Sequence, residues 1–418
     1  MRYCLRFVQL MCSVAALAGA LRYSPTVCRA DLLLGTAFDG GVLRVDETTG
    51  ATLPGSVTPG SAGLAFTSGV TVGPDGNIYV SSRGTGEVLF YDGENGAPLP
   101  SPRPGGRDGL FATLATPTTP MSTPGPLRFG PDGNLYVSDF GGSAVWRFNG
   151  ETGAFSGYAT NAFVGPPAGL TFGPDGDLFV GDFGSASVIR EDNGTPSFFI
   201  SSQSGGLLTP SSLLFLSDGD LLVADLFGNQ ILRYDENGQN PSQFAVIPPM
   251  NPPTQDNPTG SNFPSDLTLD ADGNIVLAVL GYTNPPDNRG KVMRFDQQGN
   301  LLDTILEMQT PIGSVAWIPP ADAIVGDYDG DGTVGMGDYN KWRADFGKQV
   351  ANGSGADGNR NGSVDAADYV VWRKSDGPGA QASAAIGVPE PGTIAFVCCG
   401  AFFPASVRFR NRSGRSTR

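Results

Sequence analysis

The sequence contains no histidine, although the chain has 418 residues. This absence excludes catalytic triads and dyads that use an imidazole base, and it excludes metal sites with imidazole ligands. Cysteine is also scarce, and all five cysteines lie near the two ends of the chain, within residues 1–28 or 398–418. The central part of the chain therefore has no disulfide bond, no thiolate nucleophile and no cysteine-bound zinc.

Charged residues make up only 16% of the chain, and the two signs are unevenly distributed. Residues 1–30 carry four arginines and no acid, whereas residues 388–418 carry five arginines and one glutamate. Of the 26 basic and 41 acidic residues in the whole chain, the middle keeps 17 and 40, a net charge of −23. A body this acidic repels nucleic acid and anionic membranes, so we expect neither as a partner.

Glycine and proline are abundant instead, with 60 and 34 residues. Together they make up roughly 22% of the chain, against about 12% in an average protein. Hydrophobic residues at 39% and aromatic residues at 10% exclude a disordered chain. So many turn-forming residues also exclude a mainly helical one. The composition predicts many short strands that are joined by tight turns.

Residues 1–30 are typical of a secretory signal peptide. Two arginines precede a mostly apolar run at 7–21, which has the length of the hydrophobic region of such a peptide. Small residues offer cleavage sites near Ala20 and near Ala30, and we favour cleavage after Ala30 because the first strand-like run follows it. The alternative is an uncleaved membrane anchor.

The other end of the chain has three parts: the motif VPEP at 388–391, an apolar stretch at 393–407 and a tail with five arginines. The apolar stretch is shorter than the roughly 20 residues of a permanent span. This order resembles the PEP-CTERM sorting signal of Gram-negative bacteria. The resemblance implies cleavage by an exosortase-type enzyme and delivery to the outer surface or the extracellular matrix. A simple tail anchor is the alternative.

The body contains a repeat. GPDGNIYV recurs with small changes, and each Asp-Gly pair lies between alternating apolar runs, which is a strong hairpin signal. Four predicted strands in about 43 residues are typical of one propeller blade. The five copies cover 73–80, 130–137, 173–180, 216–223 and 270–277.

A sixth blade is divided between the two ends of the body. Residues 32–57 provide three predicted strands, and residues 313–318 provide the first strand, which closes the ring. The repeat resembles NHL-repeat propellers, as in NLYVSDFGGSAVWRF at 134–148. We therefore predict an all-β, six-bladed β-propeller over residues 31–320.

Three aspartates occupy one position of the repeat: Asp139, Asp182 and Asp225. One interpretation is a carboxylate ring around the central channel that holds a cation or polarises a substrate. The other, which we favour, is a structural carboxylate that caps the following turn. Insertions at 97–125 and 247–264, with a third at 281–290, are predicted to lie on one propeller face and could wall a ligand cleft.

A duplicated acidic loop follows the propeller at 326–347 and 356–377. Both copies fit the pattern D-x-[DN]-x-[DN]-G, with an acid at position 12, and their alternating hard oxygen ligands suit Ca²⁺. Each copy leads into a predicted helix with the signature D-Y-x-x-W-R. The predicted ligands are Asp327, Asp329, Asp331, the Thr333 carbonyl and Asp338 in the first loop, and Asp357, Asn359, Asn361, the Ser363 carbonyl and Asp368 in the second.

Two such loop–helix units resemble a type I dockerin, and an aspartate at position 12 is what dockerins show. The resemblance implies a small α-helical module over 321–378 that folds with calcium and docks to a cohesin-like protein. The alternative is a calcium-stabilised spacer between the propeller and the sorting signal. In either case, residues 379–387 are predicted to be a linker between this module and the sorting signal.

These features favour an exported, surface-sorted protein whose propeller binds an unknown ligand and acts as a binding or scaffolding module. The sequence leaves catalysis open and favours its absence. The alternative is a metal-dependent hydrolase or lyase of the gluconolactonase-like propeller type, which needs no histidine. A central cluster of Glu, Asn and Asp from three blades would favour the enzyme, and a plugged or apolar channel would favour binding.

Overall fold

The computed structural model describes residues 31–37, 39–114, 123–160, 165–192, 194–248, 262–281, 289–318, 325–329, 334–350 and 353–375. The predicted signal peptide, the linker and the predicted sorting signal lie outside these ranges. Within them, no helix is both long and apolar enough to cross a membrane.

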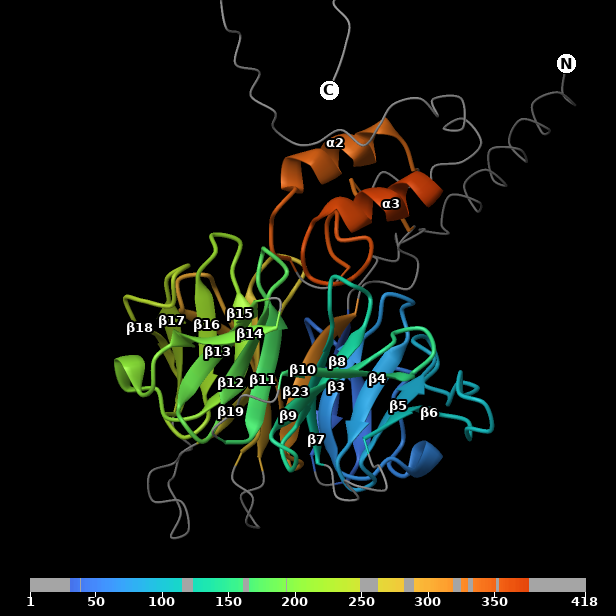
Figure 1. Cartoon of the computed structure of the whole chain (residues 1–418), viewed down its shortest axis with the longest axis horizontal. Helices are drawn as coiled ribbons and strands as arrows, with labels where there is room; N and C mark the ends of the chain where they lie inside the picture. Colours follow the sequence, from blue (N-terminus) through green and yellow to red (C-terminus); the bar gives the residue numbers. More distant parts are fainter. Residues whose placement is uncertain are drawn as a thin grey trace, which may run out of the picture. The chain divides into compact units, whose positions relative to one another are not determined.

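The described strands form six antiparallel sheets around a common centre, which confirms the predicted all-β, six-bladed propeller (Figure 1). Blade 1 consists of β3 (Thr67–Val72), β4 (Ile78–Ser82), β5 (Glu87–Tyr91) and β6 (Leu110–Thr113). Blade 2 consists of β7 (Pro124–Phe129), β8 (Leu135–Asp139), β9 (Ala144–Phe148) and β10 (Phe155–Thr160). Blade 3 consists of β11 (Pro167–Phe172), β12 (Leu178–Asp182), β13 (Ser187–Asp192) and β14 (Thr195–Ile200).

The next two blades repeat this order. Blade 4 consists of β15 (Pro210–Phe215), β16 (Leu221–Asp225), β17 (Gln230–Tyr234) and β18 (Ser242–Val246). Blade 5 consists of β19 (Pro264–Leu269), β20 (Ile275–Val279), β21 (Gly290–Phe295) and β22 (Leu301–Met308). Two 3-10 turns, η1 (Ser61–Gly63) and η2 (Ser204–Gly206), precede β3 and β15.

Blade 6 closes the ring with strands from both ends of the body, as the sequence predicts. In this sheet β1 (Asp31–Thr36) lies between β2 (Gly41–Asp46) and β23 (Ile312–Ile318). The pairing of β1 with β23 runs from Asp31 opposite Ile318 to Thr36 opposite Ile312. Segments almost 300 residues apart in the sequence are thus hydrogen-bonded neighbours.

The third strand that we predicted in blade 6 is wrong as a continuous strand. Residues 51–57 form only two isolated bridges, Val45 with Thr52 and Val42 with Val57. Pro54 has no N–H to donate, and Gly55 has a φ of 88°, so the segment turns away from the ladder between the bridges.

The Asp-Gly turns of the repeat have a common local cause. In blade 1, the Asp75 carboxylate accepts a hydrogen bond from the Asn77 N–H at 3.1 Å, and Gly76 has a φ of 79°. Only glycine adopts this left-handed conformation without strain from a Cβ atom. The turn therefore fixes the register of β3 and β4 through Asp-Gly itself.

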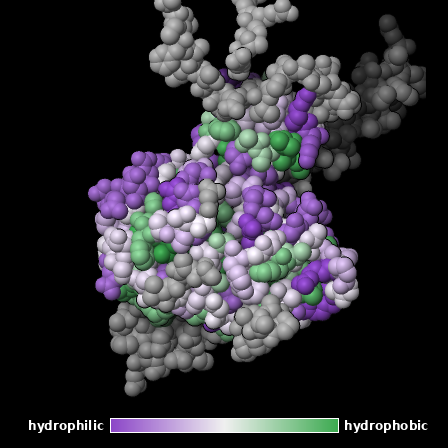
Figure 2. Space-filling model, viewed as in Figure 1, coloured by the Kyte–Doolittle hydropathy of each residue, from purple (hydrophilic) through white to green (hydrophobic). Residues whose placement is uncertain are grey.

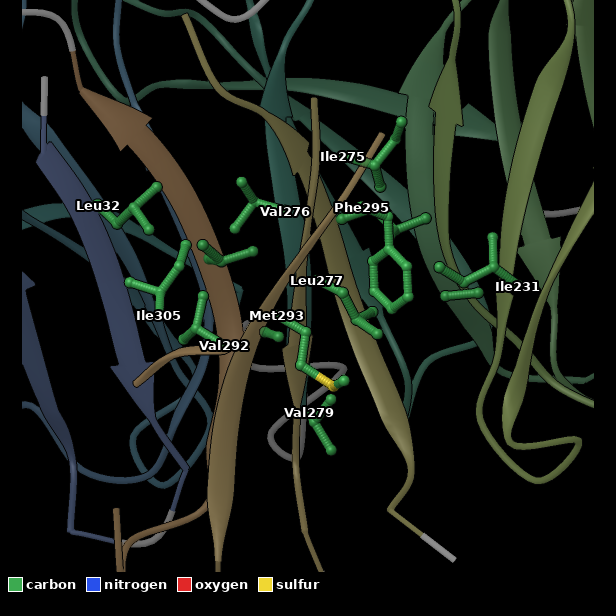
Figure 3. Packing of buried hydrophobic residues seen from close by; sticks show 14 of the residues in the cluster. Leu32, Ile231, Ile275, Val276, Leu277, Val279, Val292, Met293, Phe295 and Ile305 are labelled. Atoms are coloured by element: carbon green, nitrogen blue, oxygen red, sulfur yellow. The ribbon is translucent and has the colours of Figure 1, made fainter. Parts of the chain in front are cut away.

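The propeller core consists of layers of side chains between neighbouring blades. In β20 all five residues are buried, and successive side chains such as Val276 and Leu277 point to opposite faces of the sheet (Figure 3). Each face packs against another blade, since the cluster also includes Leu32 of blade 6 and Ile231 of blade 4. Every blade thus depends on its neighbours for burial.

The C-terminal module contains two helices, α2 (Met336–Asp345) and α3 (Ala366–Ser375). Its small core consists of Tyr328, Trp342, Ala356, Val364 and Trp372. The Trp342 indole N–H donates to the Asp365 carbonyl at 2.7 Å, and the Trp372 indole N–H donates to the Gly335 carbonyl at 3.0 Å. Each helix is therefore tied to the loop of the other repeat.

Candidate functional site: acidic loops and propeller channel

The first acidic loop brings three carboxylates together. Ligand oxygens of Asp327, Asp329 and Asp338 all lie within 4.8 Å of one another. Calcium–oxygen distances are about 2.3–2.6 Å, so oxygens on opposite sides of a Ca²⁺ ion are about 5 Å apart. The three carboxylates fit such an ion, whereas the predicted ligands Asp331 and Thr333 lie outside the described residues.

Asp338 has a second task at the start of α2. Its carboxylate accepts the Gly335 N–H at 2.6 Å and the Tyr328 N–H at 2.6 Å. A carboxylate at this position satisfies backbone donors of the first helical turn and stabilises the positive end of the helix. The acid at position 12 therefore couples the loop to its helix.

The second loop is organised by Asp357 and Asp368, which are both buried. The Asp357 carboxylate accepts the N–H groups of Gly353 at 2.9 Å and Gly362 at 2.8 Å. The Asp368 carboxylate accepts the N–H groups of Asn359 at 2.9 Å and Asp365 at 2.7 Å. The loop thus wraps around two acids through its backbone.

Burial raises the pKa of Asp357 and of Asp368. For Asp368, the nearby negative charge of Asp357 raises the pKa further. A bound cation would favour the charged form of both acids. Asn361 accepts the Ser363 N–H at 2.8 Å and donates to the Asp365 carboxylate at 3.2 Å, so its position is also set by the loop. Oxygen donors from these residues suit Ca²⁺, with fewer charges than in the first loop.

The three repeated aspartates of the propeller lie at the ends of β8, β12 and β16 and are almost fully buried. The Asp139 carboxylate accepts N–H groups of Thr123, Gly141 and Gly142 at 3.0–3.2 Å, and it also accepts the Trp146 indole N–H at 3.0 Å.

The two equivalent aspartates have the same environment. Asp182 accepts N–H groups of Gly165, Gly184 and Ser185 at 2.9–3.2 Å. Asp225 accepts those of Thr209 and Gly228 at 2.8 and 3.2 Å. Each carboxylate therefore connects the turn after its own strand to the segment that enters the blade. This is the structural, turn-capping role that we favoured from the sequence.

The channel of the propeller is crossed by an ion pair. Arg128 of β7 in blade 2 lies 3.1 Å from the Asp266 carboxylate of β19 in blade 5. Asp266 also accepts the Ser212 hydroxyl at 2.8 Å and the Val315 N–H at 3.1 Å, so two further contacts within the ring fix it. Within the described residues, the group of three acids that can share a metal lies in the C-terminal module and none lies in the propeller.

One mouth of the channel is lined by the residues that directly follow the second strand of each blade. In each blade the backbone N–H of this residue donates to the carbonyl of the residue that precedes the first strand of that blade, at 2.9–3.1 Å. This repeated hydrogen bond fixes a ring of six residues, which we call the collar. The collar consists of Ala37, Arg83, Phe140, Phe183, Leu226 and Leu280.

The collar surrounds a pocket of about 300 Å³, with Phe66 and several residues at the starts of the innermost strands completing its wall. Sequence analysis missed this pocket, although the signal was present: the collar residue follows the repeated Asp139, Asp182 and Asp225 in register. Of the predicted insertions, residues 115–122, 249–261 and 282–288 lie outside the described ranges, so the cleft stays a prediction. The described residues 97–109 of the first insertion connect β5 to β6 within blade 1, whereas the predicted cleft required them to connect one blade to the next.

No family model matches the sequence, and no curated protein matches it. Solved structures with similar folds include the nidogen/laminin complex, at 12% identity and a TM-score of 0.51, covering 69% of this chain and 98% of that one. A protein of unknown function from Bacteroides caccae has 16% identity and a TM-score of 0.50, with coverage of 69% and 99%.

Virginiamycin B lyase from Staphylococcus aureus is more distant, with 19% identity, a TM-score of 0.41 and coverage of 58% and 69%. Likeness at these identities shows the fold alone. The chain is therefore similar to these proteins in its propeller, and its function has to be inferred from its own residues.

Proposed function

We propose that this is an exported, surface-sorted binding or scaffolding protein. Its propeller binds a ligand, and its C-terminal module docks to a cohesin-like protein partner when it holds Ca²⁺. The observation that carries the binding role is the channel, which the Arg128–Asp266 pair crosses and which opens into an apolar collar. A metal-dependent hydrolase would need a cluster of acids there.

The calcium part of the proposal is supported by the three clustered carboxylates of the first loop and by the buried acids of the second. When bound, the ion would supply positive charge and rigidity to the loops. The chain's own residues do the rest: Asp338 and Asp368 link each loop to its helix, and the two indoles link each helix to the opposite loop. Calcium would thus order the surface that contacts the partner.

The export part rests on the sequence of residues 1–30 and 388–418 alone. A pattern typical of a signal peptide and a short apolar stretch with a basic tail support export of the body from the cytoplasm. Extracellular calcium is abundant enough to fill modules of modest affinity, about 10⁻⁴–10⁻³ M. The three parts of the proposal therefore agree with one another.

The proposal is tested by calcium-dependent retention on the cell surface. Purified fluorescent protein is added to washed cells that lack the chain, and bound protein is measured at millimolar Ca²⁺ and in excess chelator. We expect saturable retention in calcium that chelator and Asp329→Ala abolish, whereas the exposed propeller variant Asp108→Ala retains it. Retention that ignores both calcium and Asp329→Ala would refute calcium-dependent docking.

A further inference from the structure

We propose that the collar binds a small molecule with an apolar, preferably aromatic, body and one anionic group, which Arg83 recognises. This inference rests on the proposed binding role of the propeller and names the class of ligand. It depends on three observations: the aromatic lining of the collar, the environment of Arg83, and the small number of polar groups that remain available in the pocket.

Aromatic rings follow one another around the collar. Phe140 and Phe183 lie edge to face, with ring centroids 5.6 Å apart. Phe183 and Phe227 are 5.9 Å apart, and Phe227 and Phe263 are 6.0 Å apart, again edge to face. Phe227 is more than half exposed, at 56%. Such a row offers ring faces and edges to a planar ligand.

Arg83 completes this row in blade 1. Its guanidinium lies 5.7 Å from the ring centroid of Phe66 and 5.3 Å from that of Phe140. These cation–π contacts orient the side chain, and its guanidinium donates no hydrogen bond to any of the described residues. Among the described residues no carboxylate lies within ion-pair distance of Arg83, and its side chain is exposed.

Five other propeller arginines differ from Arg83 in this respect, whereas Arg103 and Arg147 also form no ion pair among the described residues. Arg44, Arg128, Arg190, Arg233 and Arg294 each form an ion pair with an aspartate. In a body with a net charge of −23, an arginine without a carboxylate partner marks the place where an external anion meets the least repulsion. A guanidinium next to apolar walls binds a carboxylate or sulfonate more strongly than it does in water.

Much of the remaining pocket wall is apolar, and the Thr123 hydroxyl in it has no hydrogen-bond partner among the described residues. Pro124, Pro126 and Pro167 contribute rings without N–H groups. The Ser211 and Ser265 hydroxyls donate to the Pro264 and Ile312 carbonyls of the next blade, at 2.8 and 3.0 Å, and the Ser68 hydroxyl donates in the same way to Pro124.

These hydroxyls are therefore engaged in linking the blades. A sugar needs many hydrogen-bond partners, so the pocket does not suit it. A volume of about 300 Å³ is at the lower end of the range for small-molecule sites, and it suits a compact ligand with one charge.

The site is also prepared in advance by strained backbone. Phe66 and Phe263 have φ values of 60° and 55°, in the left-handed region that bulky residues avoid at a cost of about 1–3 kcal/mol. The collar hydrogen bonds from Arg83 to the Phe66 carbonyl and from Leu280 to the Phe263 carbonyl, at 2.9 and 3.0 Å, hold both residues there. Phe66 thus lies in the pocket wall, and Phe263 extends the aromatic row next to Phe227.

The test uses two probes with the same aromatic body. One is 8-anilino-1-naphthalenesulfonate, which carries an anion, and the other is the uncharged N-phenyl-1-naphthylamine. Both are titrated into the purified full chain in calcium, and fluorescence and calorimetry report affinity and stoichiometry. We expect one site per chain and tighter binding of the sulfonate.

Arg83→Leu should weaken the sulfonate at least about tenfold and leave the uncharged probe unchanged, since only the charge contact is lost. Phe183→Ala should weaken both probes. Two matched controls, Arg103→Leu and the exposed Phe198→Ala on the outer strand of blade 3, should change neither. Unchanged thermal melting of each variant excludes unfolding as the cause.

Equal sulfonate affinity in Arg83→Leu and wild type, or weak binding at many sites, would overturn the inference. The docking proposal is tested separately by cell-surface retention, in which Arg83→Leu should show the same calcium-dependent retention as the wild type. Loss of calcium-dependent retention with intact sulfonate binding would therefore refute the docking role and leave the ligand class standing.

Discussion

Arg128 and Asp266 form an ion pair across the channel, although they are 138 residues apart in the sequence and belong to blades on opposite sides of the ring. The Asp266 side chain is only 5% exposed. Because Asp266 also contacts blade 4 through Ser212 and blade 6 through Val315, one carboxylate connects four blades. On the face drawn in Figure 2, by contrast, hydrophilic and intermediate residues surround separate hydrophobic patches.

Removing one member of this pair should destabilise the propeller. Arg128→Met leaves the Asp266 charge buried without its partner, and we expect a loss of about 3 kcal/mol in the free energy of unfolding. Chemical denaturation measures it. Arg128→Met combined with Asp266→Asn should recover part of the loss. Equal stability of wild type and both single variants would show that the pair contributes nothing.

Closure of the ring by β23 predicts the effect of a truncation. A chain that ends at Thr310 lacks β23 and with it the buried Ile312, Val315 and Trp317. Each of these contributes about 2 kcal/mol by burial, and their sum approaches the stability of a whole domain. Thermal melting of 31–310 should show a large loss of cooperativity relative to 31–320. Equal melting of the two chains would contradict the split blade.

The cap described for Asp182 distinguishes it from a metal ligand. Asp182→Ala leaves three backbone N–H groups without their acceptor and should cost about 2 kcal/mol of stability, whereas Asp182→Asn should cost less. The exposed Asp303→Ala serves as the control. If Asp182→Ala instead preserved stability and removed a bound metal ion, as measured by elemental analysis, the ring would have to be a cation site.

The sequence predicts the fold well because the hairpin signal is local. Each Asp-Gly turn sets its own register, so five blades and the closing strand follow from the repeat. The third strand that we predicted within 32–57 does not form as a continuous strand, because Pro54 and Gly55 interrupt it.

The channel was less predictable. Arg128 and Asp266 occupy different positions in their strands, so the repeat does not pair them, and only the closed ring brings them together. The collar residues look like ordinary loop residues in the sequence. They become a set only through the hydrogen bond that each blade repeats at the same end of the channel.

The sorting signal predicts the end of the mature protein. Because the apolar stretch at 393–407 is short and is followed by arginines, we expect removal of the segment beyond about Pro391 during export. Mass spectrometry of protein from the cell surface should find no peptide from 393–418. Surface protein that still ends at Arg418 would indicate a simple anchor.

Calcium uptake tests the central claim most directly. Calorimetric titration of chain 31–378 should find two calcium sites, the tighter one in the first loop, where more carboxylates lie in ligand positions. Asp331→Ala or Asp329→Ala should therefore cost more affinity than Asn361→Ala.

Chelator should also expose Trp342 and Trp372 of the module while leaving the strand signal of the propeller intact, because the small core of the module needs the metal. Tryptophan fluorescence and far-UV circular dichroism follow the two events. Two saturable calcium sites whose removal unfolds only 326–377 are the result that we predict. No calcium uptake, or spectra that chelator does not change, would contradict the account and leave this segment as an acidic spacer.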